Sequence, residues 1–144
     1  MPVAAWVVLE IVRAFAWESH AGRGEYVFKT RDEMTRVWQQ DGGKPDRMPK
    51  VDFEQELVLA VFAGQKQGTG HRIKIEAVAK PEKGKDGIVL YRETAPKGEN
   101  RAAQVTYPNH VVVIKKVDAE FKFIDIETAD GQKIVQALEQ AAKK

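Results

Sequence analysis

Few residues of this chain could do covalent chemistry. It has no cysteine, a single serine, Ser19, and three histidines, His20, His71 and His110. The lack of cysteine excludes a thiolate zinc site, an iron–sulfur cluster and a cysteine nucleophile. Ser19 lacks the Gly-x-Ser-x-Gly turn of a hydrolase, and no two histidines have the three- or four-residue spacing of a helical metal site. These residue types therefore point away from a hydrolytic enzyme, and we expect no metal or cofactor.

Two loops hold the residues best suited to recognition. The first contains Gly68-Thr69-Gly70-His71-Arg72. Its glycines permit a left-handed backbone and the close approach of another chain, while Thr69, His71 and Arg72 supply hydrogen-bond donors. The alternative is an ordinary connection between strands, in which the glycines only satisfy turn geometry.

The second loop is Tyr107-Pro108-Asn109-His110. Pro108 holds Tyr107 in an extended conformation and leaves the isomer of the Tyr107–Pro108 bond open. An exposed Tyr107 beside His110 would form a recognition surface. If the Tyr107 ring instead packs into the core, the turn has only a structural role. The predicted partner-binding residues are Gly68, Thr69, Gly70, His71, Arg72, Tyr107 and His110.

The elements that must hold these loops are mostly strands. Residues 57–63 are continuously apolar, which is typical of a central strand buried on both faces. Residues 73–79 alternate between apolar and charged side chains, as in a strand with one wet face. The β-branched run from Val3 to Val12 predicts a first strand. Further strands are expected at 25–29, 88–92, 105–107, 111–117 and 121–126, with turns or loops at 21–24, 81–87 and 96–101.

Two helices complete the expected fold. Thr30 and Glu33 form a capping box, after which Met34, Val37 and Trp38 share one helical face. A break at Asp130-Gly131 is expected before an amphipathic helix over about 131–142. Strands at short spacing, with too few helices for βαβ units, predict a mainly β (α+β) fold in one domain over 1–144. This would be an antiparallel β-sandwich or open barrel, with one short helix near the N-terminal third and one at the C-terminus.

Charge and hydropathy argue against two kinds of partner. Lys and Arg number 23 against 21 Asp and Glu, for a net charge of +2, and acidic residues are interleaved with the lysines around 80–101, so no phosphate groove is expected. The apolar start is interrupted by Glu10 and Arg13 long before the roughly 18 apolar residues that a spanning helix needs. We expect neither nucleic-acid binding nor membrane insertion by this chain.

Six features also occur in one characteristic order. They are Trp38 on the capped helix, Val51-Asp52-Phe53 before the apolar strand, Gly64 at its end, the loop 65–71, Pro96, and Thr106-Tyr107-Pro108 before the strand from Val111. This order, over about 7–116, resembles the C-terminal domain of PrcB, a family named for a subunit of a bacterial surface protease complex. Two departures stand out. The family's loop usually has Thr-Gly-Gly-Tyr in place of Gly68-Thr69-Gly70-His71, and the helix after Gly131 is not associated with it.

The resemblance implies a non-catalytic accessory module that binds a protein partner, a peptidase or its precursor, through loops at one end of a β-rich domain. It supplies no catalytic residue. The usual location of the family's members implies an extracytoplasmic protein, often lipid-anchored, whose export signal is absent from this chain. The alternative is a cytoplasmic protein. Two other functions stay open: a peptidase inhibitor presenting the Gly68–His71 loop, and a small-ligand-binding domain, which an exposed tryptophan beside a cavity would favour. The oligomeric state is left open.

Overall fold

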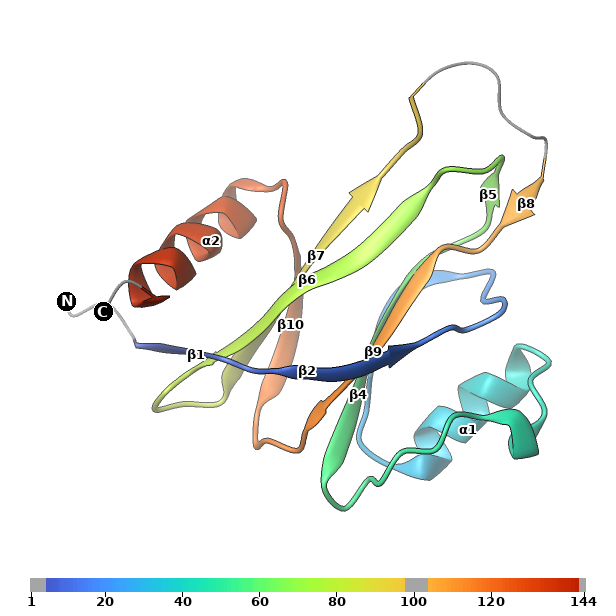
Figure 1. The fold of residues 1–144 in the computed structure, drawn as a ribbon, viewed down its shortest axis with the longest axis horizontal. Coiled ribbons are helices and arrows are strands. Elements are labelled where there is room, and N and C mark those ends of the chain that lie inside the picture. Colours follow the sequence, from blue (N-terminus) through green and yellow to red (C-terminus); the bar gives the residue numbers. More distant parts are fainter. Residues whose placement is uncertain (1–4, 98–103, 143–144) are drawn as a thin grey trace.

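The computed structural model describes residues 5–97 and 104–142 and has four layers (Figure 1). Two four-stranded sheets pack face to face, helix α1 (Arg31–Gln40) covers the outer face of one, and helix α2 (Ala129–Ala142) covers the outer face of the other. A short 3-10 helix, η1 (Pro45–Arg47), follows α1. The chain is thus a mainly β sandwich with two helices, as predicted, and no closed barrel forms among the described residues.

The first sheet has the order β1 (Trp6–Val8), β6 (Arg72–Pro81), β7 (Asp86–Thr94) and β10 (Glu120–Asp125). Its first two pairings are antiparallel, but β10 runs parallel to β7, which corrects the purely antiparallel expectation. The reason is a crossover, since β10 follows a strand of the other sheet and enters where β7 begins. There the Glu120 amide donates to the Lys85 carbonyl at 2.7 Å.

The second sheet has the order β2 (Ile11–Phe15), β9 (Asn109–Lys115), β4 (Glu56–Ala63) and β3 (Arg23–Phe28), all antiparallel. A separate two-stranded ribbon pairs β5 (Lys66–Gln67) with β8 (Val105–Thr106). As predicted, β4 is central and buried on both faces, because every residue from Leu57 to Ala63 is almost inaccessible to solvent. It therefore serves two cores at once.

Each interface between layers has its own apolar cluster. Burial of these side chains is the main force holding the layers together. Between the sheets lie Leu57, Leu59, Val61, Ile73, Ile75, Val89, Val112 and Ile114. Between α1 and the second sheet lie Trp17, Phe28, Met34, Val37, Trp38, Val58, Phe62 and Val113. Ile134, Val135 and Leu138 of α2 pack on Ala79, Ile88 and Leu90.

The predicted N-terminal strand is wrong in one respect, because it forms two strands in different sheets. The chain leaves β1 after Leu9, whose amide donates to the Val78 carbonyl at 2.8 Å, and joins the second sheet as β2. A bulge between Ile11 and Arg13 then shifts the alternation of side chains. It explains why Arg13 shares the sequence parity of apolar residues yet forms an ion pair with Glu56 at 2.7 Å. Val3 lies outside the described residues.

Helix α1 begins as predicted, and the other boundaries shift slightly. The Thr30 hydroxyl oxygen accepts from the Glu33 amide at 3.2 Å and donates to the Glu33 carboxylate at 3.0 Å. Part of the expected turn at 21–24 belongs to β3, and the turn at 81–87 is narrower because β6 and β7 extend into it. The expected loop at 96–101 is described only at 96–97.

The expected break at Asp130-Gly131 is wrong, because both residues lie in the first turn of α2. Gly131 is needed there for close packing rather than for a turn. A Cβ on this residue would lie 2.3 Å from the Asp125 carbonyl oxygen. In the part of the chain that the structure describes, no peptide bond is cis, so Tyr107–Pro108 is trans, and no helix is long and apolar enough to cross a membrane.

Candidate functional site

The β5–β8 ribbon brings the two predicted recognition loops together at one end of the sandwich (Figure 1). The Gly68 amide donates to the Gln104 carbonyl at 2.8 Å, and the Thr106 hydroxyl donates to the Gly68 carbonyl at 3.0 Å. The Gly68–Arg72 loop therefore lies beside the residue that precedes Tyr107. Thr69, His71 and Tyr107 are half-buried, and Arg72 is exposed.

The glycines of this loop have reasons within the chain itself. Gly68 and Gly70 have φ angles of 97° and 92°, in the region that favours glycine. A Cβ on Gly70 would lie 2.7 Å from the Cβ of Pro96. Turn geometry and packing thus account for both glycines, while the side chains of Thr69 and His71 are the part of the loop that could meet a partner.

His110 has a structural contact that the sequence does not indicate. It lies in β9, and its Nδ1 accepts a hydrogen bond of 2.9 Å from the Ile75 amide, beside the bulge of β6. The contact joins the two sheets. Burial, together with the positive charge of Lys74, lowers the pKa of His110 below its usual 6.5, although Glu76 opposes this.

Replacing His110 by alanine should lower the free energy of unfolding by about 1–3 kcal/mol, because the Ile75 amide loses its acceptor. The neutral imidazole is the form that accepts this bond. Its stabilisation is therefore complete above pH 6.5 and is lost as the pH falls below 6.5 toward the lowered pKa of the folded state. Urea unfolding at several pH values measures both effects.

His110→Asn is the matched control, because its side-chain oxygen can replace Nδ1 as the acceptor at any pH. This variant should lose less stability than His110→Ala near neutral pH and should show a weaker fall in stability below pH 6.5 than the unmodified protein. If both variants lose stability below pH 6.5 as steeply as the unmodified protein does, groups other than His110 cause the pH dependence.

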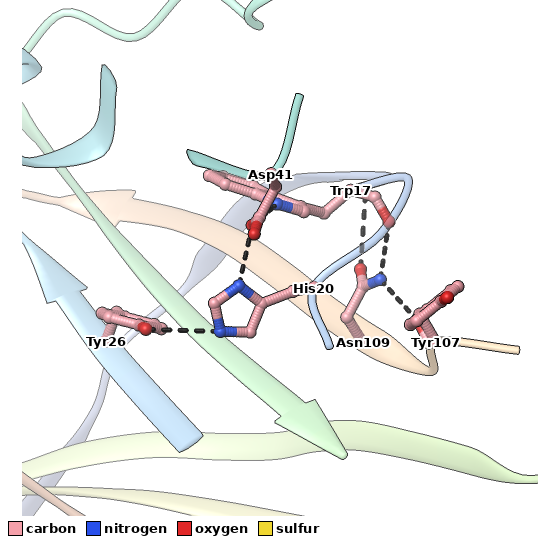
Figure 2. A network of polar contacts seen from close by, with 6 residues as sticks. All are labelled: Trp17, His20, Tyr26, Asp41, Tyr107 and Asn109. Atoms are coloured by element: carbon pink, nitrogen blue, oxygen red, sulfur yellow. Dashed lines mark hydrogen bonds and ion pairs between the residues drawn. The ribbon is translucent and has the colours of Figure 1, made fainter. Parts of the chain in front are cut away.

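A second group of polar contacts lies next to the Tyr107 turn and was missed by sequence reasoning (Figure 2). Asp41, which caps the end of α1, accepts hydrogen bonds through Oδ2 from the indole Nε1 of Trp17 at 2.8 Å and from His20 Nδ1 at 2.7 Å. The other ring nitrogen of His20 lies 3.3 Å from the Tyr26 hydroxyl. Local patterns give no sign of this network, because its members lie on separate loops and strands.

The Asp41–His20 pair resembles part of a hydrolytic triad, but its geometry is structural. His20 Nε2 contacts Tyr26 rather than a nucleophile, and within the described residues Ser19 makes no hydrogen bond to His20. The His20 ring also packs on Phe62, with ring centres 4.3 Å apart. The network thus fastens the segment after β2 to the end of α1. Nor do any three His, Asp or Glu side chains of the described residues lie close enough together to hold a metal ion.

A hollow of about 430 Å³ opens beside this network, between residues 16–19 and the loop after α1. The indoles of Trp17 and Trp38 reach it but are only 3% and 8% exposed, so they form its walls and offer no open face for stacking. The residues that line it are Ala16, Trp17, Glu18, Ser19, Trp38, Asp41, Gly42, Gly43, Lys44, Arg47 and Pro49.

Comparison with known proteins concerns the middle of the chain. Residues 57–115 match the PrcB C-terminal family model. The match runs from the start of the buried strand β4 to the end of β9, and it confirms the resemblance to PrcB. A search of curated proteins and a search of solved structures each give no significant match.

The PrcB match includes both predicted recognition loops and His110. It does not include α1 with Trp38, the segment that lines the hollow, or α2, although the resemblance was expected over about 7–116. The PrcB-like part is therefore the central strands of both sheets together with the β5–β8 ribbon. The PrcB family is that of a protease-complex subunit.

Proposed function

We propose that this protein is a non-catalytic accessory module that binds a protein partner, a peptidase or its precursor, through the end of the sandwich formed by the Gly68–Arg72 loop and Tyr107. The observation that carries the proposal is the β5–β8 pairing within the PrcB-like segment, because it fixes these loops beside each other. Loops held at both ends by strands can meet a partner with little loss of conformational entropy.

The proposed contacts are made by Thr69, His71, Arg72 and Tyr107. Gly68 and Gly70 shape the loop, and His110 supports it from β9 through Ile75. Tyrosine and arginine are frequent anchors of protein interfaces, because they combine apolar area with hydrogen-bond donors. Three nearby charges also belong to this end: Glu93 binds Arg23 at 2.5 Å and Lys66 at 3.5 Å. These ion pairs link β3, β5 and β7 and keep the base of the loop in place.

Replacing Thr69, His71 and Tyr107 together by alanine should abolish capture of the partner from a lysate of the source organism. The glycines are left intact, because a side chain on Gly70 would distort the loop itself. The control carries Gln136→Ala, Glu139→Ala and Gln140→Ala, three exposed positions on α2. Quantitative mass spectrometry compares the two with the unmodified protein; a partner retained equally by all three would contradict the proposal.

The same captured partner separates an accessory module from an inhibitor. If the partner is a peptidase, its turnover is measured with increasing amounts of this protein. An accessory module leaves turnover unchanged or raises it, whereas an inhibitor presenting Gly68–His71 would lower turnover at a near-stoichiometric dose. The α2 control variant with Gln136→Ala, Glu139→Ala and Gln140→Ala should leave any such effect in place.

A further inference from the structure

We propose that His110 is a pH-sensitive switch beneath the binding surface. Its neutral ring holds the two halves of that surface together, and its protonation loosens the Gly68–Arg72 loop beside Tyr107 and weakens partner binding. The inference rests on the proposed function, because it gives the regulation of that same surface. The residues involved all lie within the segment that matches the PrcB family.

The hydrogen bond between His110 and Ile75 joins the strands that carry the two halves of the surface. His110 follows Tyr107 by three residues at the start of β9, and Ile75 follows Arg72 by three residues in β6. The Ile75 amide donates to His110 Nδ1 at 2.9 Å. The β5–β8 ribbon secures the start of the Gly68–Arg72 loop, so this bond secures its end to the second sheet.

The first part of β6 belongs to a two-stranded arm. β1 pairs with β6 only as far as Ala79, and β10 pairs with β7 only as far as Tyr91 (Figure 1). Among the described strands, residues 72–75 therefore pair only with β7. A bulge after Ile75 interrupts the ladder at the base of this arm, where a strand bends most readily. Losing the bond to His110 at this point should change the position of the loop that the arm carries.

Protonation of His110 removes the acceptor of this bond and adds a like charge beside it. A protonated imidazole carries a proton on both nitrogens and cannot accept. It would face the Ile75 amide and the ammonium group of Lys74, while the attraction of Glu76 is shared with Arg92 at 3.4 Å. Burial first, and then Lys74, lower the pKa of His110 below its usual 6.5. The bond is therefore complete above pH 6.5 and is lost as the pH falls through the lowered pKa.

The other strands around the ring offer it no further charge. β4 pairs with His110 through Val61, and its one charged residue, Glu56, pairs with Lys115 at the opposite end of β9. From β7, Tyr91 packs into the core between the sheets. Burial raises the pKa of Tyr91 above its usual 10, so this side chain stays neutral while His110 titrates.

A second polar link should keep the arm from detaching. Glu93 of β7 binds Arg23 at 2.5 Å and Lys66 at 3.5 Å. The hydrogen bond from Arg23 lowers the pKa of Glu93 below its usual 4.5, so these ion pairs persist while His110 titrates. Ile73 also stays packed in the core between the sheets. Protonation of His110 should therefore loosen the arm without unfolding the protein.

The first test follows the backbone amides of the full chain by ¹H–¹⁵N nuclear magnetic resonance from about pH 8 to about pH 5. The signals of Gly68, Gly70, Arg72 and Ile75 should move with one common midpoint below 6.5. Their heteronuclear NOE should fall as the loop gains motion. In His110→Asn, whose side-chain oxygen can accept at any pH, these changes should be absent. Equal changes in His110→Asn, or none in the unmodified protein, would overturn the inference.

His71 needs a variant of its own, because it lies in the same loop. His71→Gln should keep the pH-dependent movement of the Gly70 and Ile75 signals, and its loss would assign the effect to His71 instead. His110→Ala lacks the acceptor at every pH, so its loop should show the lowered heteronuclear NOE already at about pH 8. A loop as rigid in this variant as in the unmodified protein would contradict the inference.

The second test measures release of the partner protein that the unmodified chain captures near neutral pH. Washing at about pH 5 should release at least about fivefold more of it from the unmodified protein than from His110→Asn. Both baits hold the same partner, so an effect of pH on the partner itself cancels in the comparison. Equal release from the two baits would overturn the link between the switch and binding.

The two proposals fail in different ways. If the loop responds to pH through His110 but the Thr69, His71 and Tyr107 variant retains the partner, the proposed binding surface fails and the change in the loop stands. If that variant loses the partner but the loop shows no response that depends on His110, the switch fails alone.

Discussion

Replacing Trp17 by alanine is expected to lower the free energy of unfolding by about 3–5 kcal/mol, the cost of removing a large aromatic side chain from a packed core. Trp17 is 3% exposed and packs against Phe28, Trp38 and Phe62, with ring centres 6.0, 5.0 and 5.6 Å away. Its loss leaves a cavity between α1 and the second sheet. Urea unfolding followed by circular dichroism measures the change.

Two further variants compare the loss from Trp17→Ala with the loss of the hydrogen bond alone and with the loss of a less buried tryptophan. Trp17→Phe keeps most of the ring packing but removes the donor to Asp41, so it should cost about 1–2 kcal/mol. Trp6→Ala, at a half-buried residue beside α2, should also cost less than Trp17→Ala. If Trp17→Ala proved no more costly than Trp6→Ala, the aromatic cluster would not be the centre of this core.

Gly131→Ala is the second change with a large expected effect, although helix propensity alone would favour alanine by about 1 kcal/mol. The new Cβ would lie 2.3 Å from the Asp125 carbonyl oxygen and 2.8 Å from the Ile126 Cα. Main-chain atoms cannot rotate away, so α2 must move off the sheet. We expect a loss of about 2–3 kcal/mol and faster proteolytic cleavage within α2.

Gly24→Ala is the control for this variant, because it adds the same methyl group in β3, where a Cβ meets no atom within 4 Å. It should be neutral or slightly stabilising, since alanine reduces the freedom of the unfolded chain. Equal stability of the two variants would show that the first turn of α2 can shift without cost.

Sequence patterns predicted the parts of the fold that depend on interactions between residues close together in the sequence. The unbroken apolar run of β4 indicated burial on both faces, and the Thr30–Glu33 capping box placed the start of α1. The break between β1 and β2 could not be predicted, since Leu9 and Glu10 include no glycine or proline to mark a turn, and only pairing with β6 and β9 separates the two strands.

The recognition loops were predicted from their residue types, and their proximity came only with the structure. The β5–β8 pairing joins segments separated by the whole of β6 and β7. The same limit applies to the network around Asp41 and to the hollow. Trp17 meets Asn109 only because β2 pairs with β9, and no short motif encodes that contact.

The N-terminal segment Trp6–Phe15 runs along the edge of both sheets, and this has a consequence for folding kinetics. Its strands pair with β6 and β9, which come much later in the chain, so these contacts must close long loops and form slowly. Until then the segment is an unpaired, valine-rich strand, and Val7, Val8 and Val12 stay partly exposed even in the folded protein. During refolding, aggregation through this strand competes with completion of the sandwich, and the competition grows with protein concentration.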